Sequence, residues 1–272
     1  MSRVILRVLQ YALLIIASLV FLAPVLWMLL MAIRPTDITA NEPLQLVFTP
    51  DFGPFAYLFS SGGGLSSLLA SVVQAGLATL VAMPLAIMAC YGLTRWRYRG
   101  RNLLGMWYLS LMLAPPVVFV IPLFIMLTTI GVVGTNWAAV IAFQTFSIPL
   151  AVLLLRSFFE ELPVEIEEAA LLDGCSRWRI LVQVFLPVLR PGLLVAGIFV
   201  FCFGWNNLLF VMPLTSGDSI PLTVRALSFY ATSGVNWTYI GATAVMSMIV
   251  PMLLFFIFRR HIVSGLTFGA VK

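Results

Sequence analysis

Glutamates are the densest group of reactive side chains in this sequence, and they gather in a polar stretch between two very hydrophobic ones. They stand at Glu160, Glu161, Glu165, Glu167 and Glu168. Pro163 suits the first position of a helix, whose dipole favours carboxylates near its N-terminus. At about 100° per residue, Glu161, Glu165 and Glu168 share one face. Such a stripe can pair with basic residues of a partner. The alternative is that the glutamates only keep a loop solvated, which we favour for Glu160 and Glu161.

The sequence predicts two short helices joined at a glycine, and these helices would position the glutamates. Gly174 predicts the end of the first helix, since glycine adopts a left-handed cap without strain. Ser176 can cap the second helix, and Pro187 is expected to stop it. Apolar residues at helical spacing predict one apolar face on the second helix, formed by Trp178, Leu181, Val182 and Phe185. Residues 157–190 are therefore expected to form a bent pair of helices, after which Pro191 starts another helix.

The composition indicates a membrane protein. Hydrophobic residues make up 62% of the chain and charged residues 9%, against about 25% charged residues in soluble domains. The expected fold class is all-α, because lipid leaves open backbone groups without partners and the apolar runs lack the alternation of a barrel. A spanning helix needs about 20 apolar residues. One transmembrane domain over 1–272 is expected, with six spans at about 8–33, 65–93, 103–130, 136–156, 191–213 and 238–259.

Arginines indicate which ends of the spans face the cytoplasm. They precede the first span, fill the connections after the second and fourth spans, and follow the sixth, whereas only Arg34 and Arg225 fall on the other side. Cationic side chains near span ends stay cytoplasmic, so both termini and the loop around Gly100 are expected inside. The net charge of +5 is then a topology signal, and no nucleic-acid partner is expected.

Catalytic and cofactor motifs are missing from the sequence. It has no GxxxxGK[ST] stretch to hold ATP phosphates, only one histidine, His261, and three cysteines without metal-ligand spacing. We therefore expect no enzyme activity, no cofactor and no metal. Between their ends the spans carry no Asp, Glu, Lys, Arg or His, which proton or sodium relays usually need. The energy source is expected in another chain.

A few polar or small residues within the spans have two possible roles. Trp205 and Asn206 fall in the middle of the expected fifth span. The amide can hydrogen-bond a hydroxylated solute and the indole can stack on a sugar. Equally, the amide can tie two helices together for about 0.6–2 kcal/mol, and both interpretations stay open. A stripe of small residues in the second span predicts the close approach of another helix, and comprises Ser67, Ser71, Ala75 and Thr79.

The stretch ending at Pro187 resembles the hallmark of the inner-membrane permease subunits of binding-protein-dependent ABC importers. That hallmark is Glu-Ala-Ala, three residues, glycine, nine residues, then Ile-x-Leu-Pro, with Val184 here in place of the isoleucine. The matching residues are Glu168, Ala169, Ala170, Gly174, Leu186 and Pro187. The resemblance implies a coupling element that docks into a groove of a cytoplasmic ATPase subunit. Glu165 is expected to contribute to that docking face, and Glu168 holds the motif's acidic position.

Three further stretches resemble carbohydrate-type permeases related to the smaller subunit of the maltose importer, namely PVLWMLLMAIR, GWNNLLFVMPLT and HIVSGLTFGAVK. The family often has Asn-Ser at the start of the second span, where this chain has Ser66-Ser67, so no role is carried to that position.

These resemblances imply a type I ABC importer permease in the bacterial inner membrane, which crosses the bilayer several times. It would pair with a second homologous permease, two ATPase subunits and an extracytoplasmic solute-binding protein. It would form half of the path for a sugar, polyol or related solute. An ion-coupled secondary transporter and an intramembrane enzyme are the alternatives. The charge-free spans disfavour the first, and the missing catalytic residues disfavour the second.

Overall fold

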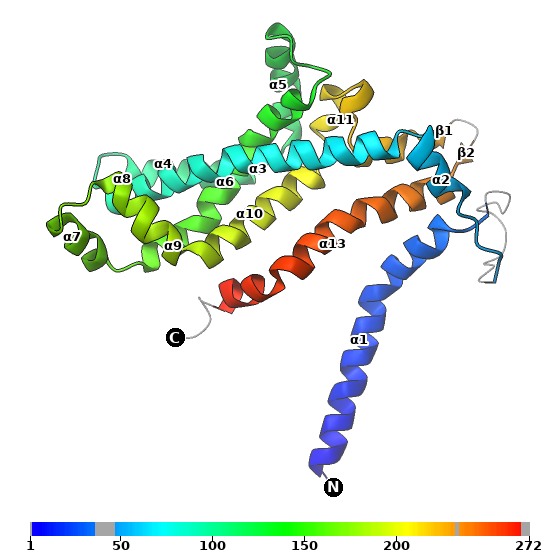
Figure 1. Ribbon diagram of the computed structural model, residues 1–272, viewed down its shortest axis with the longest axis horizontal. Coiled ribbons are helices and arrows are strands. Elements are labelled where there is room, and N and C mark those ends of the chain that lie inside the picture. Colours follow the sequence, from blue (N-terminus) through cyan, green and yellow to red (C-terminus); the bar gives the residue numbers. More distant parts are fainter. Residues whose placement is uncertain (1, 36–46, 232–233, 268–272) are drawn as a thin grey trace. The chain divides into compact units, whose positions relative to one another are not determined.

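Helices account for nearly all of the regular structure (Figure 1). The computed structural model describes residues 2–35, 47–231 and 234–267, so residues 268–272 of the stretch HIVSGLTFGAVK lie outside the described residues. The predicted all-α class is confirmed. Contacts divide the chain into two compact units, one of residues 1–65 and 222–249 and the other of residues 66–221 and 250–272.

The first unit is built on long helices that present apolar side chains outward. Along α1, the apolar side chains from Ile5 to Leu22 are exposed, so this helix needs lipid or another chain around it. Gly241 of α13 packs against α1, because a Cβ at that position would lie 2.8 Å from the backbone nitrogen of Ala32. The elements of this unit are α1 (Ser2–Ala32), α2 (Gly53–Ser60), α12 (Leu222–Leu227), β1 (Tyr230–Ala231), β2 (Gly234–Val235) and the first part of α13 (Trp237–Thr267).

The second unit holds the remaining helices and the predicted functional segments. It contains most of α3 (Gly64–Arg95), followed by α4 (Arg101–Leu113), α5 (Val117–Thr129) and α6 (Asn136–Glu161). The chain continues through α7 (Val164–Leu172), α8 (Arg177–Ile180), the π-helix η1 (Leu181–Phe185) and α9 (Leu186–Val188). It goes on with α10 (Arg190–Trp205), α11 (Val211–Leu214) and the 3-10 helix η2 (Gly217–Ser219), and it also includes the last part of α13.

Small residues on α3 let other helices approach its backbone closely. A Cβ on Gly204 of α10 would lie 3.3 Å from the Cα of Ala75, which confirms the close approach predicted from the small-residue stripe. Ala82, Ala86 and Cys90 continue the buried face of α3, and α6 adds Val152 and other buried side chains to the same core. The thiol of Cys90 donates to the carbonyl of Val152 at 3.4 Å. This core holds α3, α6 and α10 together.

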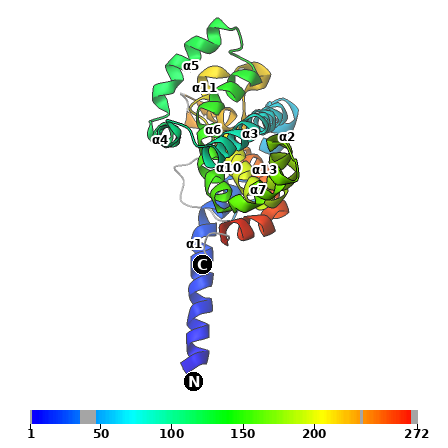
Figure 2. The same ribbon diagram turned by 90° about the vertical axis from the view of Figure 1, so that its left-hand side faces the viewer.

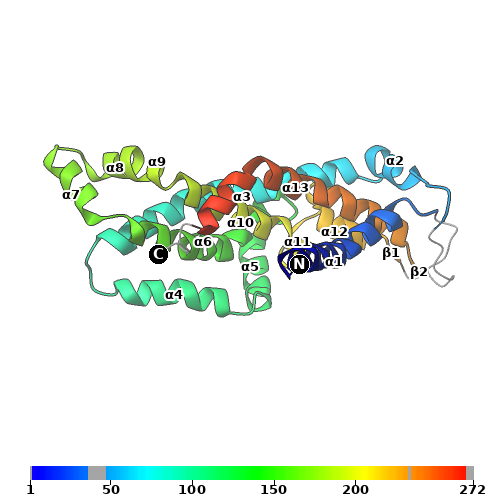
Figure 3. The same ribbon diagram turned by 90° about the horizontal axis from the view of Figure 1, so that it is seen from below.

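Proline divides the predicted third span into two helices. The span expected over 103–130 consists of two helices, α4 and α5, which meet at 99°. Ala114 between them has an extended backbone, with ψ 136°, because the ring of Pro115 disfavours helical geometry in the residue before it. Figures 2 and 3 show α5 turning away from the line of α4. Such a bend leaves carbonyl groups that need partners at the turn.

The predicted fifth span, 191–213, is also shorter than expected, because α10 ends at Trp205. A bend of 83° separates α10 from the preceding helices α8 to α9. In the described residues, four helices are each long and apolar enough to cross a bilayer, and there are up to six crossings if each bent pair counts as one. Six spans thus require that each bent pair cross the membrane once.

A polar junction ties α3, α6 and η2 together. The side-chain amide of Gln74 donates to Oδ1 of Asn136 at 2.8 Å and to the carbonyl of Ser219 at 2.7 Å. Nearby, the backbone nitrogen of Gly134 donates to the carbonyl of Leu214 at 2.8 Å. The hydroxyl of Ser219 donates to the carbonyl of Gly134 at 2.8 Å. The junction therefore joins the loop before α6 to the turn after α11.

Candidate functional site

The helix α7 carries its carboxylates on two faces. Pro163 precedes it, as predicted, and Glu165, Glu168 and Ala169 are exposed. Leu172, one turn beyond Glu168, is 90% exposed. The expected stripe is present only in part, because Glu161 is the last residue of α6 and the extended Leu162 separates it from α7. Glu165 and Glu168 remain as outward carboxylates, bordered by an exposed leucine that offers apolar contact area.

Gly174 ends α7 in the predicted left-handed conformation, with φ +80°. The backbone nitrogen of Gly174 donates to the carbonyl of Leu171, and that of Cys175 donates to the carbonyl of Ala170, both at 3.0 Å. These bonds satisfy carbonyl groups that the end of a helix leaves open. An L residue other than glycine would be strained at this φ. The bend after α7 thus depends on Gly174.

Glu167 is the important acidic residue that sequence reasoning missed. We counted it only as one of the clustered glutamates, but it is 6% exposed and points into the protein. The hydroxyl of Tyr91 on α3 donates to Oε1 of Glu167 at 2.7 Å. Oε2 lies 3.7 Å from Nε of Arg95, an ion pair too long to be a hydrogen bond. A signal was available in the sequence, because Tyr91 and Arg95 are four residues apart and share a face of α3.

Arg95 extends this contact to α6. Its Nη2 donates to the carbonyl of Leu162 at 2.8 Å and to that of Phe159 at 3.0 Å. Its Cζ also lies 5.0 Å from the centre of the Phe185 ring, within cation–π range. We call Tyr91, Arg95 and Glu167 the α3–α7 clamp. It joins the end of α3 to the end of α6 and to α7.

The second short helix differs from the prediction in two ways. Ser176 caps it as expected, since its hydroxyl accepts from the backbone nitrogen of Arg179 at 3.3 Å. Pro187 does not stop it, however. The chain stays helical to Val188 and bends at Leu189, because proline at the start of α9 occupies a position where a backbone N–H is dispensable.

The expected single apolar face is also wrong. Leu181 and Phe185 are buried in the core, whereas Trp178 is 65% and Val182 40% exposed. The π-helical turn of η1 adds a residue to the turn and rotates later side chains relative to an α-helix. An outward apolar pair, Trp178 and Val182, remains available for contact.

The predicted coupling residues do not all occupy one surface. Glu165, Glu168 and Ala169 lie on the exposed side of α7, while Ala170 packs against the core. Leu186 also packs against that core, and Pro187 is exposed in α9. Figure 1 shows α7, α8 and α9 at the same end of α6 and α10. One part of the motif therefore forms an outward surface, and the other part attaches it to the core.

Trp205 and Asn206 stand at the end of α10, not in the middle of a span as we expected. Trp205 is 3% exposed, and its ring stacks on Phe201 with centroids 5.5 Å apart. Asn206 is exposed, and its amide donates to the carbonyl of Cys202 in its own helix at 2.9 Å. The indole is thus covered in this conformation. The side-chain NH2 group of Asn206 thus bonds a carbonyl of α10 itself and does not link α10 to a neighbouring helix in this contact.

Comparison with known proteins agrees with this arrangement. Residues 82–268, more than half of the chain, match the family model described as "Binding-protein-dependent transport system inner membrane component". The chain is 32% identical to the trehalose transport system permease protein SugB of Mycobacterium tuberculosis, over 92% of each chain. It is 30% identical to the diacetylchitobiose uptake system permease protein NgcG of Streptomyces coelicolor, over 97% of this chain and 88% of that protein.

A solved structure shares the fold. A chain in the crystal structure of a bacterial ABC transporter involved in the import of the acidic polysaccharide alginate aligns with a TM-score of 0.77. The alignment covers 95% of this chain and 97% of the other, at 22% identity. The two chains therefore have the same helical architecture despite extensive divergence of their sequences.

Proposed function

Because the chain belongs to the family of binding-protein-dependent transport system inner membrane components, we propose that α7 couples it to ATPase subunits and that it forms half of the path of a carbohydrate-like solute. Family membership makes it a multi-pass ABC importer permease of the inner membrane. It works with a binding protein and ATPase subunits and is not itself an enzyme. The earlier alternatives, an ion-coupled transporter and an intramembrane enzyme, are therefore set aside.

The observation that carries the coupling proposal is the two-sided character of α7. Glu165 and Glu168 face outward, where they can pair with cationic groups of a partner. Glu167 faces inward and is held by Tyr91 and Arg95. The outward charges of such a helix can dock a partner, and its buried attachment can transmit the partner's movement to the neighbouring helices. A merely solvated loop needs no buried anchor.

The buried contacts of Glu167 and Arg95 provide a route by which movement of the ATPase subunits can reach the membrane helices. Arg95 bonds the two carbonyl groups at the end of α6, and Tyr91 of α3 bonds Glu167 of α7. When α7 moves, we expect α3 and α6 to move with it, because closely packed helices shift as units rather than deforming continuously. Closure of the ATPase subunits would in this way change the access of the solute path.

The proposed solute class is an uncharged sugar, polyol or related compound. The relatives SugB and NgcG are named for trehalose and diacetylchitobiose, both carbohydrates. In this chain, the exposed amide of Asn206 at the end of α10 offers a carbonyl oxygen to solute hydroxyls. Trp205 would contribute only after leaving its packed position against Phe201.

The proposed assembly contains a second homologous permease, two ATPase subunits and a solute-binding protein. One chain of this size supplies only part of the wall of a path. The exposed apolar length of α1 is consistent with contacts to lipid or to the second permease. The expected composition of the purified complex is one copy of each permease with two ATPase subunits, measurable by native mass spectrometry.

Charge reversal on α7 tests the coupling proposal. Glu168→Lys should reduce the ATPase subunit retained on the purified permease, and uptake with it, by about tenfold, because the reversed charge repels the cationic groups of the partner. Glu160→Gln is the control, since Glu160 is already bonded to Arg156 within the chain at 2.7 Å. Normal ATPase retention and uptake in Glu168→Lys would remove the coupling assignment.

Uptake measurements test the solute class. Proteoliposomes containing the whole importer and its binding protein should take up at least one neutral disaccharide or polyol when ATP is inside. An ionic solute of similar size serves as the comparison. Transport restricted to amino acids or inorganic ions would refute the carbohydrate class while leaving the coupling proposal intact.

A further inference from the structure

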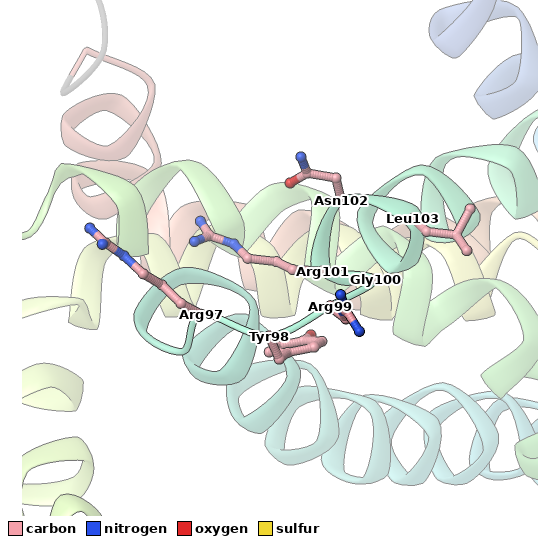
Figure 4. Close-up of a pocket in the computed structure, with 7 residues that line it drawn as sticks. All are labelled: Arg97, Tyr98, Arg99, Gly100, Arg101, Asn102 and Leu103. Carbon is pink, nitrogen blue, oxygen red and sulfur yellow. The ribbon is translucent and has the colours of Figure 1, made fainter.

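The loop between α3 and α4 forms a hollow that has no role in the coupling proposed for α7. It has a volume of about 480 Å³ and is lined by residues 97–103. Figure 4 shows Arg97 and Arg101 extending to the same side of this loop. The arginine distribution of the sequence places the loop on the cytoplasmic side of the membrane. The hollow is therefore expected close to the headgroups of the inner leaflet.

The charges of this hollow are not neutralised by the chain itself. Arg97, Arg99 and Arg101 line it, and within the described residues none of them forms an ion pair with a carboxylate. Nε of Arg101 is buried and has no hydrogen-bond partner in the described structure. An unpaired buried donor on a cation costs free energy until an acceptor reaches it. The hollow thus calls for an anion with several oxygen acceptors.

Backbone geometry adds donors to the same place. Gly100 has φ +89° and precedes α4 directly, so the chain turns sharply into the helix. The first N–H groups of a helix have no partner inside it, and the helix dipole adds partial positive charge there. In α4 these groups belong to Asn102 and Leu103, which also line the hollow. A phosphate fits this combination of donors better than a carbohydrate hydroxyl does.

An apolar furrow adjoins the arginine hollow and shares Tyr98 with it. The furrow measures about 390 Å³ and runs between α3 and α4, with Met88, Leu93, Trp96, Leu104 and Tyr108 among its lining residues. Gly92 lies on its wall, where an added Cβ would meet nothing within 4 Å. A free phosphate would not use this surface, whereas a hydrocarbon chain would fill it.

We propose that this pair of hollows binds an anionic phospholipid of the cytoplasmic leaflet. The phosphate would lie among Arg97, Arg99 and Arg101, and an acyl chain would follow the furrow between α3 and α4. Trp96 and Tyr98, 48% and 40% exposed, stand at the junction, where aromatic side chains favour the membrane interface. An acidic protein surface would match the arginines but not the apolar furrow. The bound lipid would fill the space between the two helices beside the α3–α7 clamp.

Binding of phosphatidylglycerol to the purified importer tests the proposal, with phosphatidylcholine as the neutral lipid and native mass spectrometry as the measurement. The triple variant Arg97→Gln, Arg99→Gln, Arg101→Gln should weaken phosphatidylglycerol binding by about fivefold for each arginine removed. The control triple variant, Arg7→Gln, Arg259→Gln, Arg260→Gln, removes the same charge from exposed positions outside the hollow. It should leave the binding unchanged.

Filling the furrow tests the acyl-chain part separately. Gly92→Leu should reduce phosphatidylglycerol binding by about tenfold, because the new side chain occupies the furrow. Gly76→Leu is the matched control, since Gly76 lies on the same helix and also has open space around it. Both variants should assemble with the ATPase subunits.

Three results would overturn the proposal. The first is equal loss of phosphatidylglycerol binding in the two triple variants, which would mean that only overall charge matters. The second is displacement of the lipid by millimolar glycerol phosphate together with normal binding in Gly92→Leu, which would indicate a site for a soluble phosphate. The third is loss of ATPase subunits from the loop variant with unchanged lipid binding, which would indicate a protein-docking surface.

Discussion

The hydroxyl of Tyr91 lies 2.7 Å from Oε1 of Glu167, 76 positions away in the chain, and this buried contact joins a long helix to the short helix α7. Arg95 stands one turn after Tyr91 and bonds the carbonyl groups of Phe159 and Leu162, shortly before α7. The same small region thus combines a fixed inner side with a charged outer side. The proposed coupling function depends on both.

Removal of the Tyr91 hydroxyl should destabilise the permease. Tyr91→Phe leaves the buried Glu167 with one donor fewer, which should cost about 1–3 kcal/mol and lower the Tm of the purified complex. Tyr98→Phe makes the same chemical change on a 40% exposed ring, and should change stability by less than about 0.5 kcal/mol. Thermal unfolding of the two variants distinguishes them. Equal Tm values would show that the clamp contributes nothing to stability.

Substitution of Glu167 should also uncouple ATP hydrolysis from uptake. Glu167→Ala breaks a buried pair, at a cost of about 3–5 kcal/mol, whereas Glu167→Gln keeps an oxygen that can accept from Tyr91. We expect Glu167→Gln to assemble and to hydrolyse ATP with less solute transported for each ATP. The measurement is uptake divided by ATPase activity in proteoliposomes. An unchanged ratio in an assembled Glu167→Gln complex would contradict transmission through the clamp.

Gly174→Ala should strain the bend after α7. At the φ of +80° that Gly174 adopts, a residue with a Cβ destabilises the folded chain by about 1–2 kcal/mol. The strain comes from the backbone alone, because no neighbouring atom would clash with that Cβ. Gly76→Ala, inside α3 with open space around it, should instead stabilise the chain by up to about 1 kcal/mol. Opposite shifts of Tm in the two variants, with reduced ATPase retention only in Gly174→Ala, are the expected result. A neutral Gly174→Ala would show that the bend tolerates another conformation.

Gln74→Leu should weaken the junction of α3, α6 and η2. The change leaves the carbonyl of Ser219 and Oδ1 of Asn136 without their donor, which should cost about 1–3 kcal/mol. Gln183→Leu is the control, because Gln183 is exposed and its Oε1 accepts a hydrogen bond from Nε of Arg179, one turn earlier, at 3.0 Å. Hydrogen exchange of the turn after α11 should increase in Gln74→Leu alone. Equal protection in both variants would contradict the assigned role.

Asn206→Leu separates a path role from a structural one. If Asn206 contacts solute, the assembled complex should keep its Tm and basal ATPase activity while uptake falls by about tenfold. The bond that the amide donates to the carbonyl of Cys202 lies at the end of α10 and is expected to contribute about 1 kcal/mol or less at an exposed site. Uptake that is unchanged for each assembled complex would remove Asn206 from the proposed path.

Much of the local structure was predictable because short-range rules decide it. The end of α7 at Gly174 follows from the conformational freedom of glycine, and the cap at Ser176 follows from side-chain chemistry one turn away. The all-helical class follows from composition, because apolar segments in lipid must satisfy their own backbone groups. Each of these depends on residues close together in the chain.

The inward side of α7 depended on tertiary structure. Glu167 and Glu168 are adjacent and chemically identical, so only the position of Tyr91 and Arg95 on another helix decides which one is buried. The sequence by itself determined the all-helical class, the cap at Ser176 and the bend at Gly174. Tertiary structure alone decided which carboxylate anchors α7 and which are left for a partner, because burial depends on neighbours that are distant in the chain.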